Sequence, residues 1–262
     1  MSHTEGVDVS DVVLVERHDA VQVVTINRPA VKNALDAAVA QAVAEAIDEL
    51  DESGDLRAGV ITGAGGTFST GMDLKAFLRG ESPSLPGRGL CGITITPPRK
   101  PLVAAVEGWA LAGGFELLLA CDLVVAARTA RFGVPEVKRS LVARGGAAYL
   151  LPRRIPQAIA LELLLTGEPI DADRAAEIGL VNRLTDEGEA LDAAIELAVQ
   201  IAANGPLAIA ATKQIARSSG DWTLEEGWER QFAMSLPVFQ SEDAAEGATA
   251  FAEKRPPVWK GR

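Results

Sequence analysis

The chain has few of the side chains on which nucleophilic and metal-dependent enzymes rely. Its 262 residues include two histidines and two cysteines. Both histidines, His3 and His18, stand near the amino terminus, so a Ser–His–Asp or Cys–His catalytic apparatus is not expected. Cys91 and Cys121 provide neither a disulfide framework nor the spacing of metal ligands. We therefore expect no metal site.

Basic charge and long apolar runs are also scarce. Acidic side chains outnumber basic ones, 36 to 25, for a net charge of −11 and a pI near 4.8. Nucleic acid needs a basic surface and is not an expected partner. Residues 1–10 lack the basic segment and apolar run of a signal peptide. The apolar stretch 109–121 is too short to span a bilayer and contains Glu116. These absences predict a cytoplasmic protein without a membrane partner.

The first two-thirds of the chain alternate strand and helix signals. A chain of this length with 48% hydrophobic residues can bury a large core. Apolar residues at helical spacing predict a helix over 35–50. Strands are predicted at 21–26, 59–62, 103–106 and 123–127. This alternation predicts an α/β core, in which residues 80–100, rich in Gly, Pro and Ser, form a loop.

The last third reads as mainly helical. One short strand is predicted at 180–184. Helices are predicted at 158–165, 171–178, 191–203, 206–218, 223–236 and 242–253. We expect two parts: an α/β core over 1–200 that carries the functional site, and a helical region over 201–262.

A glycine turn separates the predicted strand 103–106 from an apolar helical stretch at 117–120. Its sequence is Ala112-Gly113-Gly114-Phe115. Consecutive glycines let a ligand approach the backbone closely, and the first N–H groups of a helix lack partners. These groups lie at the positive end of the helix dipole. The turn is therefore suited to an oxygen that acquires negative charge.

Two glutamates, Glu116 and Glu136, stand twenty residues apart on either side of the predicted strand 123–127. Taken singly, Glu116 could merely complement a helix dipole and Glu136 could be a solvated loop acid. Carboxylates buried near apolar walls exchange protons near neutral pH. If both converge on the glycine turn, the parts indicate an acid/base site that stabilises an enolate.

Two other segments contain glycine turns. Residues 63–66 resemble a dinucleotide fingerprint, but Phe68 stands where its third glycine should be, so a Rossmann site is not expected. Residues 68–75 read as a loop that enters a helix. There Gly71 permits a tight turn and Asp73 is available as a helix cap.

Taken together, these segments resemble the crotonase (enoyl-CoA hydratase/isomerase) superfamily over nearly the whole chain. The segments that carry the resemblance are 27–35, 68–75, 112–116, 132–136 and 251–255. The resemblance implies a spiral of ββα units with a helical C-terminal trimerisation region. It also implies a homotrimer or hexamer that acts on an acyl-CoA.

The resemblance also implies roles for individual residues. The backbone N–H groups of Met72 and Gly113 would form an oxyanion hole for a thioester carbonyl. Glu116 and Glu136 match the two glutamates of hydratases. No cofactor is expected to be bound permanently, because coenzyme A belongs to the substrate. Residues implied in binding it are Lys32, Ser69, Thr70, Gly71, Asp73, Phe251 and Lys254, the last two often in a neighbouring subunit.

The function implied is hydration of a 2-enoyl-CoA to a 3-hydroxyacyl-CoA. An isomerase, which needs one well-placed carboxylate, and a non-catalytic acyl-CoA-binding protein remain alternatives. Residues 135–138 and 253–262 resemble the carnitinyl-CoA dehydratase branch. Arg144 stands where hydratases of the family usually have glycine, and it could line the acyl pocket or contact another subunit. The acyl group is therefore left open.

Overall fold

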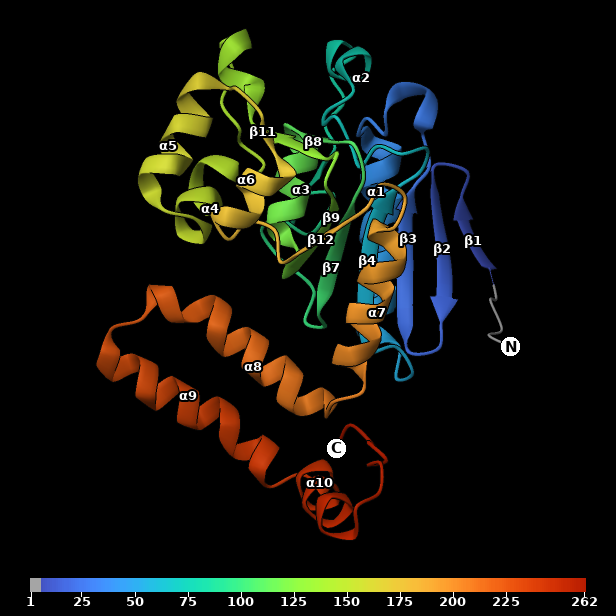
Figure 1. Cartoon of the computed structure of the whole chain (residues 1–262), viewed down its shortest axis with the longest axis vertical. Helices are drawn as coiled ribbons and strands as arrows, with labels where there is room; N and C mark the ends of the chain where they lie inside the picture. Colours follow the sequence, from blue (N-terminus) through green and yellow to red (C-terminus); the bar gives the residue numbers. More distant parts are fainter. Residues whose placement is uncertain (1–5) are drawn as a thin grey trace.

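The computed structural model describes residues 6–262, and its largest element is a seven-stranded sheet (Figure 1). The strands lie in the order β1-β2-β3-β4-β7-β9-β12. Their bounds are Gly6–Ser10, Val13–His18, Val21–Ile26, Ala58–Gly63, Leu102–Val106, Leu123–Ala127 and Arg183–Thr185. The first three strands are antiparallel, and every pairing from β3 to β12 is parallel. Parallel strands need crossover connections, which here carry the helices.

Helices cover both faces of the parallel part of this sheet. Side chains of adjacent positions point to opposite faces. Val24 and Ile61 pack with helix α1 (Ala37–Glu52), whereas Val23 and Val60 pack with helix α7 (Ala190–Ala202). The apolar runs of β4 and β7 follow from this double burial, which removes the alternation of half-exposed strands.

A smaller sheet lies beside the main one and bears the glycine turn. It joins β8 (Trp109–Leu111) in parallel to β10 (Arg131–Gly133), which pairs antiparallel with β11 (Ile170–Asp171). Helix α3 (Gly113–Ala120) follows β8 and is buried along its whole length. A short hairpin, β5 (Ser84–Leu85) and β6 (Gly89–Leu90), interrupts the segment expected to be a loop.

Short helices complete the α/β body. The α-helices are α2 (Leu74–Leu78), α4 (Ala147–Arg154), α5 (Gln157–Thr166) and α6 (Ala172–Glu177). The 3-10 turns are η1 (Pro29–Val31), η2 (Pro135–Arg139) and, beyond the body, η3 (Ser219–Asp221). Of these elements, α4 and η2 complete the candidate site described below.

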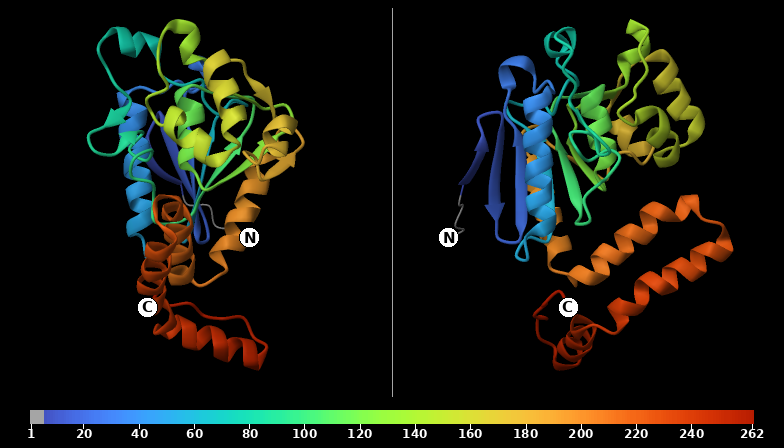
Figure 2. Two further views of the ribbon diagram at one scale, coloured as in Figure 1. Left: turned by 90° about the vertical axis from the view of Figure 1, so that its left-hand side faces the viewer. Right: turned by 180° about the vertical axis from the view of Figure 1, so that it is seen from behind.

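Residues 206–262, here called the C-terminal arm, extend away from the body (Figures 1 and 2). The arm consists of α8 (Pro206–Ser218), α9 (Leu224–Phe239), α10 (Glu242–Glu253) and the tail that follows. Helices α8 and α9 run side by side as a hairpin, and α10 lies beyond the open end of this hairpin, near the start of α8.

Polar contacts attach the arm to the body at three places, one of which is the ion pair of Arg153 on α4 with Asp221. On α8, Lys213 Nζ lies 2.6 Å from Asp122 Oδ2, and Arg217 Nη1 lies 2.9 Å from Asp122 Oδ1. In the tail, Trp259 Nε1 donates to the Ala203 carbonyl at 2.8 Å. The arm is therefore fixed to the body although few of its apolar side chains are buried.

The structure confirms the predicted α/β class. The strands predicted at 21–26, 103–106 and 123–127 match β3, β7 and β9 closely. The helix predicted over 117–120 begins earlier, at Gly113, so Glu116 lies inside its first turn. The division at residue 200 and the trimerisation role of the arm stay predictions.

Within residues 6–262, no single helix combines the length and apolar character needed to cross a bilayer. By length and composition alone, one pair passes together, Ala190–Ala202 with Pro206–Asp221, which is bent by 109°.

Candidate active site

The site is built around the turn that starts α3. Ala112 has a φ of 50°, a conformation that non-glycine residues seldom adopt. Its N–H donates to the Gly133 carbonyl at 3.0 Å, and its carbonyl accepts from Glu116 N at 3.0 Å. Gly113 is the first helical residue, so its N–H has no acceptor within the helix. The turn thus places an N–H group without an intrahelical partner at the start of α3.

A second segment brings another amide to the same place. Leu35 and Met72 form an isolated parallel bridge, in which Leu35 N donates to Gly71 O and Asp73 N donates to Leu35 O, both at 2.8 Å. Because both bonds of the bridge belong to Leu35, the Met72 N–H takes no part in it. Gly71 has a φ of 88°, and a Cβ built there would lie 2.7 Å from Gly113 N. The Met72 and Gly113 amides are therefore close neighbours.

Buried hydrogen bonds hold the 68–75 loop in this position. Ser69 Oγ donates to the Asn33 carbonyl at 2.8 Å and accepts from Gly71 N at 3.2 Å. Asp73 caps α2 and pairs with Arg28, whose Nη2 lies 3.1 Å from Asp73 Oδ2. Ser69 and Asp73, which the resemblance implied in coenzyme A binding, thus have structural partners.

The other implied loop residues lie nearer the surface. Lys32 is exposed in a left-handed conformation, and its carbonyl accepts from Thr70 N at 3.1 Å and Thr70 Oγ1 at 3.3 Å. Thr70 is half-buried. Their side chains are accessible for a ligand that crosses this loop.

Glu116 projects from α3 onto the start of α4. Only 5% of the residue is exposed. Its Oε1 accepts from Ala147 N at 3.1 Å, and a Cβ built on Gly145 would fall onto its Oε2. The same Cβ would lie 3.2 Å from Leu90 Cδ2 on the β5–β6 hairpin. The carboxyl group is thus enclosed by backbone amides on one side and an apolar wall on another.

This enclosure sets the proton affinity of Glu116. Burial, which disfavours the charged form, raises its pKa to about 7, and the negative charge of Glu136 adds to the rise. Hydrogen bonds from the amides of Ala147, Gly145 and Gly146 act in the opposite direction. Glu116 can therefore both donate and accept a proton near neutral pH.

Glu136 lies in the first turn of η2 and is half-buried. In the part of the chain that the structure describes, its buried Oε2 has no hydrogen-bond partner. Burial raises the pKa of Glu136, whereas its own amide and the charge of Arg139 lower it. Its charge acts on Glu116, so the two carboxyl groups lie within electrostatic reach of each other.

Two residues named from the sequence lie elsewhere, and a third lies at the edge of the site. Phe251 is 88% exposed and Lys254 caps the exposed end of α10, at the far end of the arm from α3 (Figure 1). Within one chain they do not reach the site. Arg144 is exposed, but it directly precedes Gly145 and so lies at the edge of the site.

Sequence reasoning missed the start of α4 as part of the site. The signal was present, since Gly145-Gly146 precede a helix as Gly113-Gly114 do. It also missed Leu35 and Leu90, which lie 3.4 Å and 3.5 Å from a Cβ built on Gly113. Nothing in an apolar residue of a strand or loop marks it as a wall of a site.

Comparison with known proteins places the chain in a family. Residues 16–262 match the family model described as Enoyl-CoA hydratase/isomerase. The chain belongs to this family. It is 43% identical over 259 residues to the enoyl-CoA hydratase EchA19 of Mycobacterium tuberculosis, covering 95% of this chain and 96% of that protein. The enoyl-CoA hydratase/isomerase resemblance drawn from the five motifs is confirmed.

Two further proteins are similar to the chain over nearly its whole length. A crystal structure of an enoyl-CoA hydratase from Mycobacterium tuberculosis H37Rv is 56% identical, with a TM-score of 0.95 over 97% of this chain and 100% of that chain. A carnitinyl-CoA dehydratase of Citrobacter koseri is 43% identical over 255 residues, 94% of this chain and 97% of that protein.

Across residues 6–262, no group of three or more His, Cys, Asp or Glu side chains is placed to hold a metal ion.

Glu116→Gln should change how stability depends on pH. The pKa of this carboxyl is 4.5 ordinarily and about 7 in the folded chain, so the folded state binds the proton more tightly. The wild-type protein therefore loses up to roughly 3 kcal/mol of stability as the pH rises from the lower pKa to the higher one. Above the higher pKa, this group causes no further loss. The variant lacks this loss. Its free energy of unfolding relative to the wild type, measured in urea from pH 5 to pH 8, should rise with pH.

The exposed Glu162→Gln is the matched control, and its difference from the wild type should stay flat. If the Glu116→Gln difference were equally flat, the raised pKa would be wrong.

Proposed function

We propose that the protein adds water reversibly across the double bond of a 2-enoyl-CoA to give a 3-hydroxyacyl-CoA. The observation that carries this proposal is the buried carboxyl group of Glu116, on which the charge of Glu136 acts, in the first turn of the helix whose first amide, Gly113 N, adjoins Gly71. The members of the family at 43% and 56% identity that are named enoyl-CoA hydratases support it.

The two amides are proposed to bind the thioester carbonyl. As water attacks, negative charge moves onto that oxygen and an enolate forms. Two N–H donors and the positive end of the α3 dipole stabilise this charge more than they stabilise the neutral carbonyl. Losing one such donor typically costs about 3–4 kcal/mol of transition-state stabilisation.

The two glutamates are proposed to manage the protons of one water molecule. One carboxylate removes a proton as the hydroxyl oxygen bonds to the β-carbon. The α-carbon of the enolate then takes a proton with the help of the other carboxyl group. The pKa values of both groups are raised, which suits this exchange, and that of Glu116, about 7, lets it hold or release a proton near neutral pH.

Coenzyme A is proposed to bind as part of the substrate along the loops before α2. Lys32 offers an exposed positive charge for phosphate, and Thr70 and Gly71 offer the turn beside it. Ser69 and Asp73 act through their structural bonds, which hold this turn. No permanently bound cofactor enters the proposal.

Dehydration of a carnitinyl-CoA is the second candidate. The observation that favours it is the 43% identity to a carnitinyl-CoA dehydratase. Arg144 at the edge of the site is available to a polar acyl group. An isomerase is less favoured because it needs one carboxyl group, and this site encloses two. The pair likewise disfavours a protein that only binds acyl-CoA.

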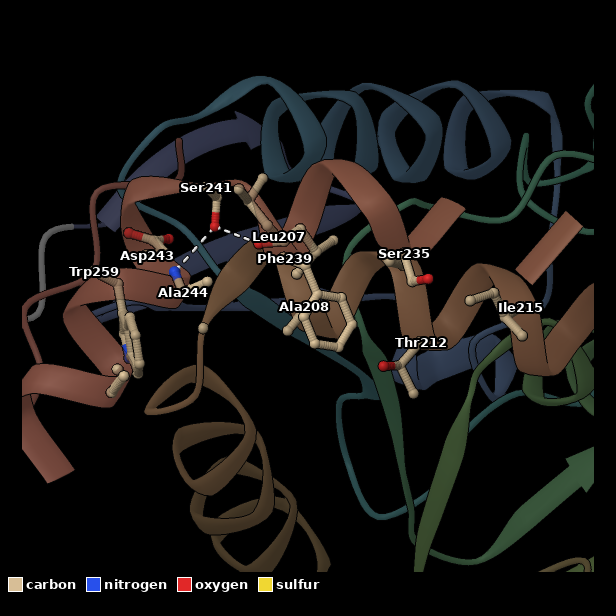
Figure 3. A pocket seen from close by; sticks show the side chains of 15 residues that line it. Leu207, Ala208, Thr212, Ile215, Ser235, Phe239, Ser241, Asp243, Ala244 and Trp259 are labelled. Atoms are coloured by element: carbon tan, nitrogen blue, oxygen red, sulfur yellow. Dashed lines mark hydrogen bonds between the residues drawn. The ribbon is translucent and has the colours of Figure 1, made fainter. Parts of the chain in front are cut away.

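We also propose that the protein forms a trimer or hexamer in the cytoplasm through the C-terminal arm. One stripe of α9 exposes five large apolar side chains: Leu224, Trp228, Phe232, Leu236 and Phe239. A cleft of about 390 Å³ lies between α8, α9 and α10, and Leu207, Phe239 and Trp259 are among its lining residues (Figure 3). Contiguous exposed apolar surface of this kind is typical of subunit interfaces. Phe251 and Lys254 would then reach coenzyme A in a neighbouring subunit.

Glu116→Gln and Glu136→Gln should each lower kcat for hydration of crotonyl-CoA by about 10²–10⁴-fold. The fold and the KM should change little, because glutamine keeps the shape and loses the proton exchange. The double variant should be little worse than either single one, since the two groups act together. Loss of enoyl absorbance measures the rate. Near-normal turnover in either single variant would refute the assignment.

Gly71→Ala should abolish hydration by displacing the Gly113 amide, which would lie 2.7 Å from the new Cβ. Gly80→Ala is a matched control, because Gly80 has a similar φ of 80° but nothing within 4 Å of a built Cβ. Both variants place alanine at a similar positive φ, so backbone strain affects both. A lower kcat/KM in Gly71→Ala than in Gly80→Ala therefore reports obstruction of the Gly113 amide. Equal losses in the two variants would count against the two-amide site.

Replacing Phe232 and Phe239 together by glutamate should break the assembly. Light scattering on the wild type should give three or six times the chain mass of 27.4 kDa, and on the double variant a smaller species. Leu165→Glu, on the exposed face of α5, is the control and should keep the wild-type mass. A monomeric wild type would refute the proposed assembly.

A further inference from the structure

Helix α4 runs alongside α3 and is bonded to it at both ends. At its start, Ala147 N donates to Glu116 Oε1 at 3.1 Å. At its end, Arg154 Nη1 donates to the Cys121 carbonyl at 2.7 Å, and Nη2 donates to the Asp122 carbonyl at 3.2 Å. Glu116 lies in the first turn of α3 and Cys121 directly follows its last residue, so the two helices run in the same direction.

One face of α4 makes all of these contacts. Ala147, Leu151 and Arg154 follow one another at helical spacing, and the first two are fully buried. The adjacent Arg153 points outward, where it pairs with Asp221 and lies 4.8 Å from the ring of Tyr149. Two neighbouring arginines on one helix therefore have opposite surroundings.

The guanidinium of Arg154 bonds to two backbone carbonyl groups rather than to a carboxylate side chain. The Asp122 side chain is already engaged by Lys213 and Arg217 from the C-terminal arm. These carbonyls directly follow the carboxyl end of α3, where the negative end of the helix dipole favours a nearby cation. A planar guanidinium can bond two of them at once, and an ammonium group cannot reproduce this geometry.

We propose that Arg154 is a positioning residue for Glu116: by holding the end of α4 against the end of α3, it keeps the amides at the start of α4 on the Glu116 carboxyl group. The proposal rests on the proposed function only in treating Glu116 as catalytic. Apart from these amides, the group acting on Glu116 is the carboxylate of Glu136 from η2. Arg154 thus acts on the reaction through the placement of α4, at the opposite end of the helix.

The test compares Arg154→Met, Arg154→Lys and Arg153→Met. The titration of Glu116 is followed by NMR of protein labelled with ¹³C at the glutamate carboxyl carbons, and its signal is assigned by its absence from Glu116→Gln. Arg154→Met should raise the titration midpoint of Glu116 by about 0.5–1 pH unit, because the amides that favour the carboxylate move away. Arg154→Lys should give a smaller rise, and Arg153→Met none.

Hydration kinetics on the same variants give a second readout. Arg154→Met should lower kcat about tenfold and move its pH profile in the direction of the NMR midpoint, with KM little changed. Arg153→Met should match the wild type in both. A merely structural arginine would lower the amount of folded protein without moving either midpoint.

Two results would overturn the proposal. One is a folded Arg154→Met with the wild-type Glu116 midpoint, and the other is an equal shift in Arg153→Met. If Arg154→Met does not fold, an unchanged midpoint in Arg154→Lys overturns the proposal, and a raised one supports it. The titration needs no substrate. A shift in a protein that hydrates no enoyl-CoA would support the positioning role and refute the proposed function.

Discussion

The site depends on one buried carboxyl group and on what offsets the cost of burying it. An ionised carboxylate removed from water is strongly disfavoured unless hydrogen bonds replace the lost hydration. Glu116 receives them from the amides of Ala147, Gly145 and Gly146 at the start of α4. This replacement is incomplete, so its pKa stays near 7 rather than returning to its ordinary value. The balance between burial and the α4 amides leaves a group that exchanges protons at neutral pH.

Two helix starts form the walls of this site, and glycine makes both possible. At the start of α3, a Cβ on Gly114 would fall onto the Ser69 carbonyl, and one on Gly71 would obstruct the Gly113 amide. At the start of α4, a Cβ on Gly145 would fall onto Glu116. Glycine therefore lets other atoms approach both starts closely, where the first N–H groups lack partners within their own helix. The first faces the proposed carbonyl position and the second faces the acid/base group.

Much of this arrangement was predictable from local sequence. Buried strands such as 103–106 carry continuous apolar runs, which made the strands predictable. The sequence Ala112-Gly113-Gly114 predicts a turn with amides at a helix start, so the centre of the site was predictable from residue patterns. Glu116 and Glu136 stood out as a pair by their positions on either side of the strand 123–127, and the resemblance to a known family implied a catalytic role for both. The role of α4 was not predictable, because the contact of Ala147 with Glu116 joins residues 31 positions apart. Ser69 and Asp73 illustrate the same difficulty, since their partners Asn33 and Arg28 come from a different segment.

Isotope incorporation tests the central claim that these groups add one water molecule to an activated double bond. The protein is incubated with a 2-enoyl-CoA in D₂O enriched in ¹⁸O, and the product is examined by mass spectrometry. The account predicts a 3-hydroxyacyl-CoA with one ¹⁸O on the β-carbon and one deuterium on the α-carbon. A shifted double bond without ¹⁸O, or unchanged substrate with purified, folded protein, would contradict it.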